Sequence, residues 1–400
     1  MSQAAYIIDI VRTPVGKFGG TLSSVRPDDL AAHIIKALIE RNPQLDLSEV
    51  EDIIFGAANQ AGEDNRNVAR MAGLMAGLPI ETAGLTVNRL CASGLQAIMD
   101  ASRATMLNEG GAYIAGGVES MTRAPFVMAK AETPFSRNAE IYDTTIGWRF
   151  PNPKLSAMHY PFAMGETAEN VAEKWKISRE EQDEFAHGSQ LKYDAAHKAG
   201  KFQSELISVS IPQRKTDDIV FDKDEHPRLS SVEKLASLKP AFKKDGTVTA
   251  GNASGVNDGS AAALVVSEAT MKKYNLKPIA RVVSMAVAGV TPDCMGIGPV
   301  PATQKALKRA GLKISDLDLI ELNEAFASQS IACMRDLELN PEIVNVNGGS
   351  IAIGHPLGAS GARISATLLH EMQKRENVKY GLATMCVGVG QGAAVIYEKL

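Results

Sequence analysis

Apolar runs alternate with segments of helical spacing through the first 120 residues of the chain. Short apolar runs bounded by glycine or polar residues are typical of buried strands, and apolar residues three and four positions apart are typical of helices. The elements predicted in this way are a strand at 6–10, a helix at 27–41, a strand at 50–56, a helix at 65–77, a strand at 85–90, a helix at 92–108 and a strand at 112–116. This alternation predicts an α/β fold with a mostly parallel, buried sheet.

A second series of the same kind begins near residue 280. Its predicted elements are strands at 281–286, 317–322, 344–347, 380–386 and 393–397, with helices at 302–310, from about 325 and from about 360. Ala92-Ser93-Gly94 and Ala359-Ser360-Gly361 are separated by the same number of positions as Tyr113 and Tyr380. A shared spacing in the same strand–turn–helix–strand context predicts two related halves.

The pattern changes between the two series, over residues 121–247. Residues 121–165 are irregular and rich in Met, Pro and aromatic residues. Ser178 and Glu181 form a capping box that predicts a helix start, and Gly200 is placed to end this helix. We expect this insert to be a lid or ligand-binding loop domain rather than a further layer of the core. The expected division is 1–120 plus 248–275, then 121–247, then 276–400.

Composition narrows the possible functions. A net charge of −4 gives no reason to expect a nucleic-acid partner. No apolar run approaches the roughly 18 residues that a membrane span needs, so no span is expected. Four cysteines without close pairing do not form a disulfide framework and favour a reducing, cytoplasmic compartment. No Walker loop, His-Glu-x-x-His segment or zinc-type cysteine spacing occurs, so we expect no metal.

Cys91 and His355 are the first candidates for chemistry. Cys91 follows a predicted strand and opens a predicted helix, where unpaired N–H groups favour a thiolate. Free cysteines are often inert core residues. Here the tight turn before Gly94 is expected to present the thiol at the carboxyl end of a strand. A nucleophilic cysteine needs a base within hydrogen-bond reach, and His355, held between Gly354 and Pro356, is the natural candidate.

Three further segments offer polar groups. Cys386 ends a predicted strand before the Gly-rich segment 388–392, and the strand that follows argues against a dinucleotide site. We interpret this segment as a loop whose amides line an oxyanion pocket beside a thiol. Asn323 either caps the next helix or holds a water molecule against a developing oxyanion. The small-residue turn at 249–255, which contains Ser254, is either a flexible connector or a surface for an extended ligand.

Five motifs in this order resemble the thiolase family, and the resemblance covers essentially the whole chain. They are Asn-Arg-Leu-Cys-Ala-Ser-Gly at 88–94, Gly-Asn-Ala-Ser-Gly at 251–255, Asn-Glu-Ala-Phe at 323–326, Gly-His-Pro at 354–356 and Cys-Val-Gly at 386–388. The resemblance implies a five-layered αβαβα unit with a loop domain that holds coenzyme A. It also implies thiolytic cleavage of 3-ketoacyl-CoA to acetyl-CoA and a shortened acyl-CoA, reversibly, through an acyl group on Cys91.

The same resemblance implies a role for each motif. Cys91 is the acyl-carrying nucleophile, His355 activates it and Cys386 is a second acid/base. Asn323 holds a water that forms one oxyanion hole with His355, and the amides of Cys91 and Gly388 form the other. The residues implied to contact coenzyme A are Phe242, Ala253, Ser254, Met295, Ala325 and Phe326 along the pantetheine arm and Arg228 at the nucleotide end. Coenzyme A is then a substrate, no cofactor is tightly bound, and a homodimer or homotetramer is expected.

The resemblance leaves the acyl group of the 3-ketoacyl-CoA substrate undetermined. Short-chain biosynthetic members carry a His-Met pair where this chain has Ala163-Met164, which argues against strict acetoacetyl-CoA specialisation. Residues 320–323, 355–357 and 389–391 resemble the degradative 3-ketoacyl-CoA branch of fatty acid β-oxidation, and 62–70 and 143–150 resemble β-ketoadipyl-CoA thiolases. The alternatives are an acetoacetyl-CoA-forming acetyl-CoA C-acetyltransferase and a ketoacyl synthase of the same fold. Cys386 argues against the latter, because synthases usually place His or Asn there.

Overall fold

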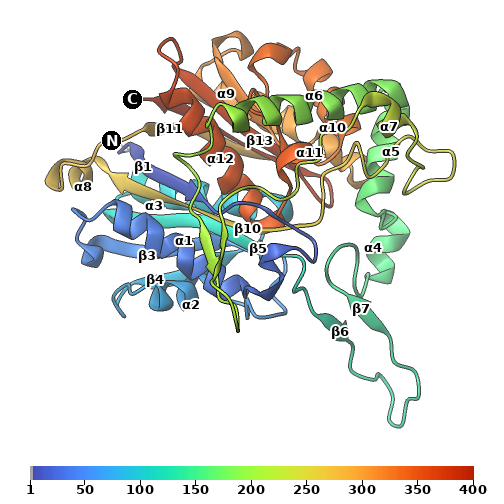
Figure 1. Cartoon of the computed structure of the whole chain (residues 1–400), viewed down its shortest axis with the longest axis horizontal. Helices are drawn as coiled ribbons and strands as arrows, with labels where there is room; N and C mark the ends of the chain where they lie inside the picture. The colour runs from blue at the N-terminus through green and yellow to red at the C-terminus, as the bar shows by residue number, and fades with distance from the viewer. Residues whose placement is uncertain (1–2) are drawn as a thin grey trace.

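A ten-stranded mixed sheet runs through the computed structural model, which describes residues 3–400 (Figure 1). Along the sheet the strands follow the order β12-β13-β14-β11-β1-β10-β5-β3-β4, and the short β2 pairs with β10. The strands are β1 (Ala5–Arg12), β2 (Gly16–Lys17), β3 (Val50–Gly56), β4 (Ala83–Val87), β5 (Ala112–Ser120), β10 (Asn257–Ser267), β11 (Ala280–Gly289), β12 (Leu319–Leu322), β13 (Tyr380–Val387) and β14 (Gln391–Lys399).

The expectation of a mostly parallel sheet is wrong. Only the pairs β3/β4, β3/β5 and β12/β13 are parallel, and every other pair in this sheet is antiparallel. Buried strands are apolar on both faces, so their sequences do not distinguish the two pairing directions. The strand expected at 344–347 is also wrong, because Val344 forms only a single bridge with Ile320. β10, buried at every residue, was not predicted.

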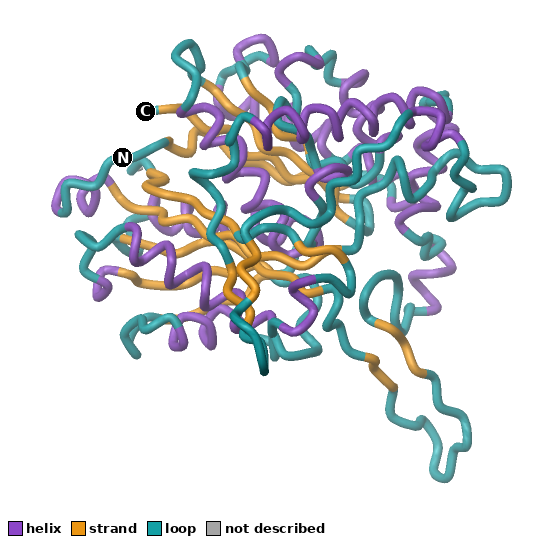
Figure 2. Tube along the Cα trace, viewed as in Figure 1, coloured by secondary structure: helices purple, strands orange, loops and turns teal. Residues whose placement is uncertain are grey.

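Five layers result from the way helices cover this sheet (Figures 1 and 2). The helices are α1 (Pro27–Arg41), α2 (Val68–Met75), α3 (Ser93–Met106), α4 (Pro153–Met158), α5 (Met164–Lys174), α6 (Arg179–Lys198), α7 (Val232–Ala236), α8 (Glu268–Lys273), α9 (Pro299–Ala310), α10 (Ala327–Asp336), α11 (Ser350–Ile353) and α12 (Leu357–Gln373). The sheet consists of two half-sheets, β12-β13-β14-β11 and β1-β10-β5-β3-β4. Helices α3 and α12 share one core with the inner faces of both half-sheets. α1 and α2 cover the outer face of one half-sheet, and α9 and α10 cover the outer face of the other. The expected αβαβα arrangement is confirmed.

The two Ala-Ser-Gly repeats meet where α3 crosses α12. A Cβ added to Gly94 would lie 2.8 Å from the carbonyl oxygen of Gly358, and one added to Gly361 would collide with the amide of Leu95. Glycine is therefore required on both helices for their backbones to approach so closely. The crossing lies near the first turn of each helix, so the segments that precede α3 and α12 are brought together.

The insert contains the hairpins β6 (Phe126–Met128) with β7 (Ile141–Asp143) and β8 (Val209–Ile211) with β9 (Ile219–Phe221), together with α4 to α7. The β6–β7 hairpin extends away from the body of the molecule (Figure 1). The predicted capping box is present: the Ser178 hydroxyl accepts from the Glu181 amide at 3.2 Å, and Glu181 Oε2 accepts from the Ser178 amide at 2.8 Å. Within residues 3–400 no helix has the length and apolar character to cross a membrane.

A buried arginine connects the insert to the core. Arg12, in β1, is fully buried and pairs with Glu205 at 2.6 Å and Asp224 at 2.7 Å. Asp224 also accepts a hydrogen bond from the amide of Val15 at 2.8 Å. Burying a charged group is costly unless it is paired and hydrogen-bonded, as Arg12 is. The segment after α6 is therefore held against the sheet at Glu205 and Asp224.

Candidate active site

Cys91 lies in a short 3-10 turn, Leu90–Ala92, between the end of β4 and the start of α3. Leu90 has a left-handed φ of 46°, so the chain reverses sharply just before the helix. This turn contacts α12 and β13, which belong to the other half of the molecule. The Cys91 side chain is only partly buried, and the backbone amides of Gly388 and of Cys91 itself lie close enough to its sulfur to lower its pKa. The thiol is therefore accessible and lies next to two backbone donors.

Desolvation by the surrounding protein raises the pKa of the Cys91 thiol to about 11, although the side chain is not fully enclosed, and the two backbone amides offset only part of this effect. The buried carboxyl of Glu119 raises this pKa further. We expected the helix start to favour a thiolate, and this expectation is wrong, because the effect of desolvation is larger than that of the backbone donors. The resting side chain is therefore a protonated thiol, and its reaction requires a base.

His355 is a neutral imidazole with a defined tautomer. Its Nδ1 lies 2.6 Å from Ser360 Oγ, and the Ser360 hydroxyl donates its only hydrogen to the carbonyl of Pro356 at 2.7 Å. Ser360 must therefore accept from Nδ1–H, which leaves Nε2 without a proton. Burial, and then the charge of Arg363, lower the pKa of His355 to about 3. Nε2 is thus free of a proton at neutral pH and can accept one. The His355 amide donates to Asn257 Oδ1 at 2.9 Å, which holds the loop.

Asn323 follows β12 and lies beside His355. Its amide donates to the carbonyl of Thr384 at 3.0 Å, and its Oδ1 accepts from the Ser350 hydroxyl at 2.6 Å. Its Nδ2 lies 3.4 Å from His355 Nε2. The capping interpretation is wrong, because the N-cap of α10 is Phe326 and no side chain caps that helix. The Asn323 carboxamide therefore presents an N–H donor toward the imidazole.

Cys386 is the last residue but one of β13 and is 1% exposed. Burial, and then the proximity of Cys91, raise the pKa of Cys386 well above its ordinary value, so the second thiol also holds its proton. The strand continues into the turn that contains Gly388, where an added Cβ would lie 3.0 Å from Leu90 Cδ1. The two thiols and the amide of Gly388 therefore lie close together, although Cys91 is far from Cys386 and Gly388 in the sequence.

Most residues expected to contact coenzyme A lie together beside Cys386. A buried apolar cluster contains Ala168, Val248, Ala253, Met295, Ala325, Phe326 and Cys386. The amide of Ser254 donates to the carbonyl of Ala325 at 3.0 Å, and the ring of Phe242 meets that of Phe326 edge to face at 6.3 Å. Arg228 is exposed and not part of this cluster, and its guanidinium donates to the carbonyl of Ala250.

Sequence reasoning missed Glu119, a buried carboxyl near the end of β5. Its oxygens accept hydrogen bonds from the amides of Ala58 at 2.9 Å, Asn59 at 3.1 Å and Gly358 at 2.7 Å. Burial nevertheless raises the pKa of Glu119 to about 7. The available signal was a charged residue after the otherwise apolar run 112–118. Glu119 connects the loop after β3 to the first turn of α12, next to the loop of His355.

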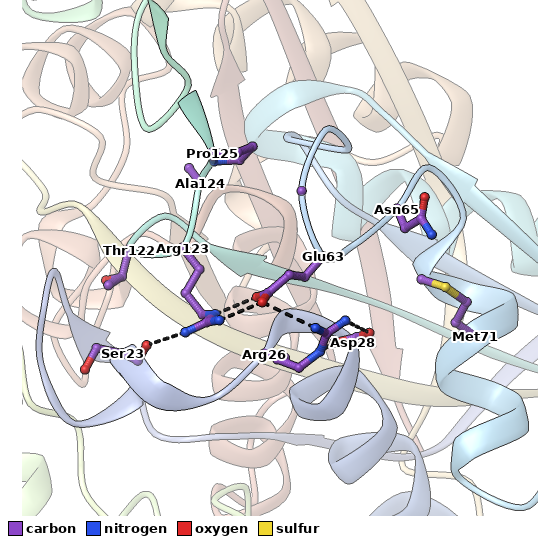
Figure 3. Close-up of a pocket in the computed structure, with 11 residues that line it drawn as sticks. Ser23, Arg26, Asp28, Glu63, Asn65, Met71, Thr122, Arg123, Ala124 and Pro125 are labelled. Carbon is purple, nitrogen blue, oxygen red and sulfur yellow. Dashed lines mark hydrogen bonds and ion pairs between the residues drawn. The ribbon is translucent and has the colours of Figure 1, made fainter. Parts of the chain in front are cut away.

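A separate cavity of about 670 Å³ contains none of the motif residues (Figure 3). It lies between the start of α1, the loop after β3 and the segment after β5, and its charged residues are paired. Glu63 accepts two hydrogen bonds from Arg123, at 2.5 and 2.6 Å, and Arg26 donates to Asp28 at 2.8 Å. These cations are neutralised by neighbouring carboxylates, so this cavity has no free charge with which to attract an anionic substrate.

The whole chain matches known proteins. The family model described as thiolase, N-terminal domain, matches residues 5–269, and the thiolase, C-terminal domain, matches residues 276–399. The chain is 54% identical to a β-ketoadipyl-CoA thiolase of Acinetobacter baylyi, over 99% of each sequence. It is 54% identical to the 3-oxoadipyl-CoA/3-oxo-5,6-dehydrosuberyl-CoA thiolase of Escherichia coli K12, over all of both. An acetyl-CoA acetyltransferase of Chromobacterium violaceum is 46% identical, over 98% of this chain and 99% of that one.

Solved structures agree with this assignment. The human mitochondrial 3-ketoacyl-CoA thiolase in complex with CoA is 42% identical with a TM-score of 0.92, and the match covers 100% of this chain and 98% of that chain. The acetyl-CoA acetyltransferase of Bacillus anthracis is also 42% identical, with a TM-score of 0.93 and coverage of 100% and 99%. With both domains matched end to end by named acyltransferases, this chain is an acyltransferase that belongs to the thiolase family.

Proposed function

We propose that this protein cleaves 3-ketoacyl-CoA with coenzyme A, reversibly, to acetyl-CoA and a shortened acyl-CoA, through an acyl group on Cys91. One observation carries the proposal: an accessible thiol beside two backbone amides lies next to a second buried thiol, and its turn contacts α12, the helix that the neutral imidazole of His355 precedes. Covalent acyl transfer requires a nucleophile, a base that activates it and a separate proton donor. Cys91, His355 and Cys386 supply these three groups.

In the first half-reaction, His355 Nε2 takes the proton of Cys91, and the thiolate attacks the 3-keto carbon of the substrate. The resulting oxyanion accepts from the amides of Cys91 and Gly388. The bond between C2 and C3 breaks, and the enolate oxygen of the departing acetyl-CoA accepts from protonated His355 and from water held by Asn323. Cys386 then protonates C2, which releases acetyl-CoA.

In the second half-reaction, the Cys386 thiolate takes the proton of the incoming coenzyme A thiol. The coenzyme A thiolate attacks the acyl group on Cys91, and the new thioester forms as the Cys91 sulfur leaves. Cys91 recovers its proton from His355, so all three groups return to their resting protonation states. The protonated resting states of Cys91 and Cys386 and the neutral His355 fit this cycle.

We propose 3-oxoadipyl-CoA as the preferred acyl substrate. The support is that relatives named for it are 53–55% identical to this chain, whereas the relative named acetyl-CoA acetyltransferase is 46% identical. Thiolysis should be measured for 3-oxoadipyl-CoA, acetoacetyl-CoA and a long unbranched 3-ketoacyl-CoA. We expect kcat/KM to favour 3-oxoadipyl-CoA by about tenfold or more, equivalent to about 1.4 kcal/mol of transition-state binding. A preference for acetoacetyl-CoA would instead favour the acetyl-CoA C-acetyltransferase alternative, and a long-chain preference would favour β-oxidation.

Coenzyme A is proposed to lie against the insert 121–247 and the turn of Ser254. Ser254 is partly exposed, and its amide is fixed by Ala325, so a bulky side chain there would fill the space beside the apolar cluster. We expect Ser254→Trp to raise the KM for coenzyme A about tenfold or more, while iodoacetamide still alkylates Cys91 at the original rate. Ser204→Trp, at an exposed position between α6 and β8, is the control and should leave that KM unchanged. An unchanged KM in Ser254→Trp would place coenzyme A elsewhere.

A homodimer or homotetramer is proposed for the assembly. The β6–β7 hairpin and its loop expose Phe126, Met128, Phe135 and Ile141 by 74, 61, 101 and 67%. β4 is the outermost strand of the sheet, with an open edge. Exposed apolar side chains and open strand edges are features that association covers. Light scattering should give a mass of two or four chains, and a monomer at micromolar concentration would contradict this proposal.

The proposed compartment is the reducing cytoplasm. All four cysteines are free thiols, and the proposed cycle needs both Cys91 and Cys386 in the reduced form. An oxidised link between Cys91 and Cys386 would remove the nucleophile and the proton donor together. Activity of the isolated enzyme should therefore depend on a thiol reductant.

A further inference from the structure

We propose that Arg363 and Ser350 are positioning residues that hold the Asn323 carboxamide with its Nδ2 toward His355, an inference that rests on the proposed role of Asn323. A chain of hydrogen bonds leads from the middle layer to the site. Arg363 Nη2 donates to Ser350 Oγ, and the Ser350 hydroxyl donates to Asn323 Oδ1 at 2.6 Å. The opposite atom of the carboxamide, Nδ2, lies 3.4 Å from His355 Nε2.

Arg363 fixes the direction of these hydrogen bonds. The two ends of an asparagine carboxamide have the same shape, so packing alone does not choose between them. A guanidinium has N–H donors and no acceptor, and Ser350 has one hydroxyl hydrogen. Ser350 accepts from Arg363, and among the described residues Asn323 Oδ1 is the acceptor of its hydrogen, which a reversed carboxamide would leave without a partner. In the reverse orientation Oδ1 would face the unprotonated His355 Nε2, and two acceptors would oppose each other in a buried site.

Arg363 is buried without the interactions that would make its burial stabilising. Arg363 and Asn323 are each 1% exposed and Ser350 is 0% exposed. The nearest carboxylate oxygen, Oε2 of Glu321, lies 3.8 Å from Nη1, beyond hydrogen-bond distance, and burial raises the pKa of Glu321 to about 8. Among the residues that the structure describes, Nε and Nη1 of Arg363 have no hydrogen-bond partner. A buried cation with one hydrogen bond is costly, which points to a role in the site rather than in folding.

Helix α12 orients both His355 and Asn323. Ser360, in its first turn, fixes the tautomer of His355, and Arg363, one turn later, fixes Asn323 through Ser350. The helix is packed between the two half-sheets and shares its core with α3. The imidazole and the water-holding carboxamide that are proposed to act on the enolate oxygen are therefore aligned by one rigid element, as a preorganised oxyanion site requires.

The test compares Ser350→Ala with two matched variants. Ser350→Thr keeps the hydroxyl, and Ser365→Ala removes a different buried hydroxyl, in α12, that donates to the carbonyl of Gly361. We expect Ser350→Ala to lower the kcat of thiolysis about 10- to 100-fold, part of the effect of losing an oxyanion donor. The KM values and the rate of Cys91 alkylation by iodoacetamide should stay unchanged. Ser350→Thr should recover most of kcat, and Ser365→Ala should keep it.

Asn323→Asp tests the orientation of the Asn323 carboxamide while keeping the hydrogen bonds through Ser350. Aspartate has the shape of asparagine but places oxygen at both ends, which reproduces the reversed carboxamide and leaves the Ser350 hydrogen bond possible. We expect a loss of kcat at least as large as in Ser350→Ala. Full kcat in Asn323→Asp would overturn the proposed orientation even if Ser350→Ala failed to fold.

Asn323→Ala separates this inference from the proposed function. If Asn323→Ala loses kcat about 10²- to 10³-fold and Ser350→Ala keeps it, the function stands and the positioning role is overturned. If Asn323→Ala keeps full kcat, the proposed role of Asn323 is wrong and the inference falls with it. Slower alkylation of Cys91 together with raised KM values in Ser350→Ala would indicate a general loss of structure and would also overturn the positioning role.

Discussion

Replacing Cys91 by alanine is expected to lower the kcat of thiolysis by about 10³-fold or more. The side chain supplies the sulfur on which the acyl group is carried, and no other thiol in the site has both exposure and amide donors. Cys386 is 1% exposed and belongs to the apolar cluster, so it cannot take over. Steady-state thiolysis of 3-oxoadipyl-CoA and of acetoacetyl-CoA measures the loss.

The covalent intermediate gives an independent check of the same prediction. Incubation of the unsubstituted enzyme with acetyl-CoA should place one acetyl group on the peptide that contains Cys91, as detected by peptide mass spectrometry. Cys294→Ala is the control, because Cys294 is a buried thiol in a different apolar cluster and should keep kcat within about twofold. An acetyl group found solely on another cysteine would contradict the assignment of the nucleophile.

The sequence predicts the catalytic elements better than the sheet that carries them. Cys91 and His355 each precede a helix with small residues in its first two turns, and the repeat of Ala-Ser-Gly indicates that these helices occupy equivalent places in two halves. The structure explains the repeat by the close crossing at Gly94 and Gly361. Pairing direction could not be predicted, because a buried strand is apolar throughout in either case. β10 escaped prediction because its first part is rich in Gly, Ser and Ala rather than in large apolar residues.

Properties that depend on contacts between residues far apart in the sequence also could not be predicted. The local helix start predicts a thiolate at Cys91, but the burial that raises its pKa comes from α12 and β13. Arg363 looks like an ordinary polar position of a helix, and only the folded chain shows that its charge is buried and directed at Ser350. Local patterns identify reactive residue types, whereas their protonation and orientation are set by residues from the other half.

Replacing Cys386 by serine is expected to lower thiolysis about 10²- to 10⁴-fold while leaving the acylation of Cys91 largely intact. Cleavage of the carbon–carbon bond leaves an enolate that must gain a proton, and the incoming coenzyme A thiol must later lose one. Serine has the shape of cysteine but a far higher pKa, so it neither donates nor accepts that proton readily. His355 cannot replace Cys386, because it already exchanges its proton with Cys91 in both half-reactions.

A matched substitution separates this chemistry from the effect of placing a hydroxyl in an apolar site. Cys294 is also a buried thiol, in a different apolar cluster, so Cys294→Ser measures the structural cost alone and should keep most of the thiolysis rate. Acylation of Cys91 by a simple activated thioester needs no enolate, so Cys386→Ser should still form the acyl-enzyme at a rate near that of the unsubstituted protein. If Cys386→Ser retained near-full thiolysis, the two-thiol cycle would be wrong, and a synthase-type mechanism with a different proton donor opposite the nucleophile would gain support.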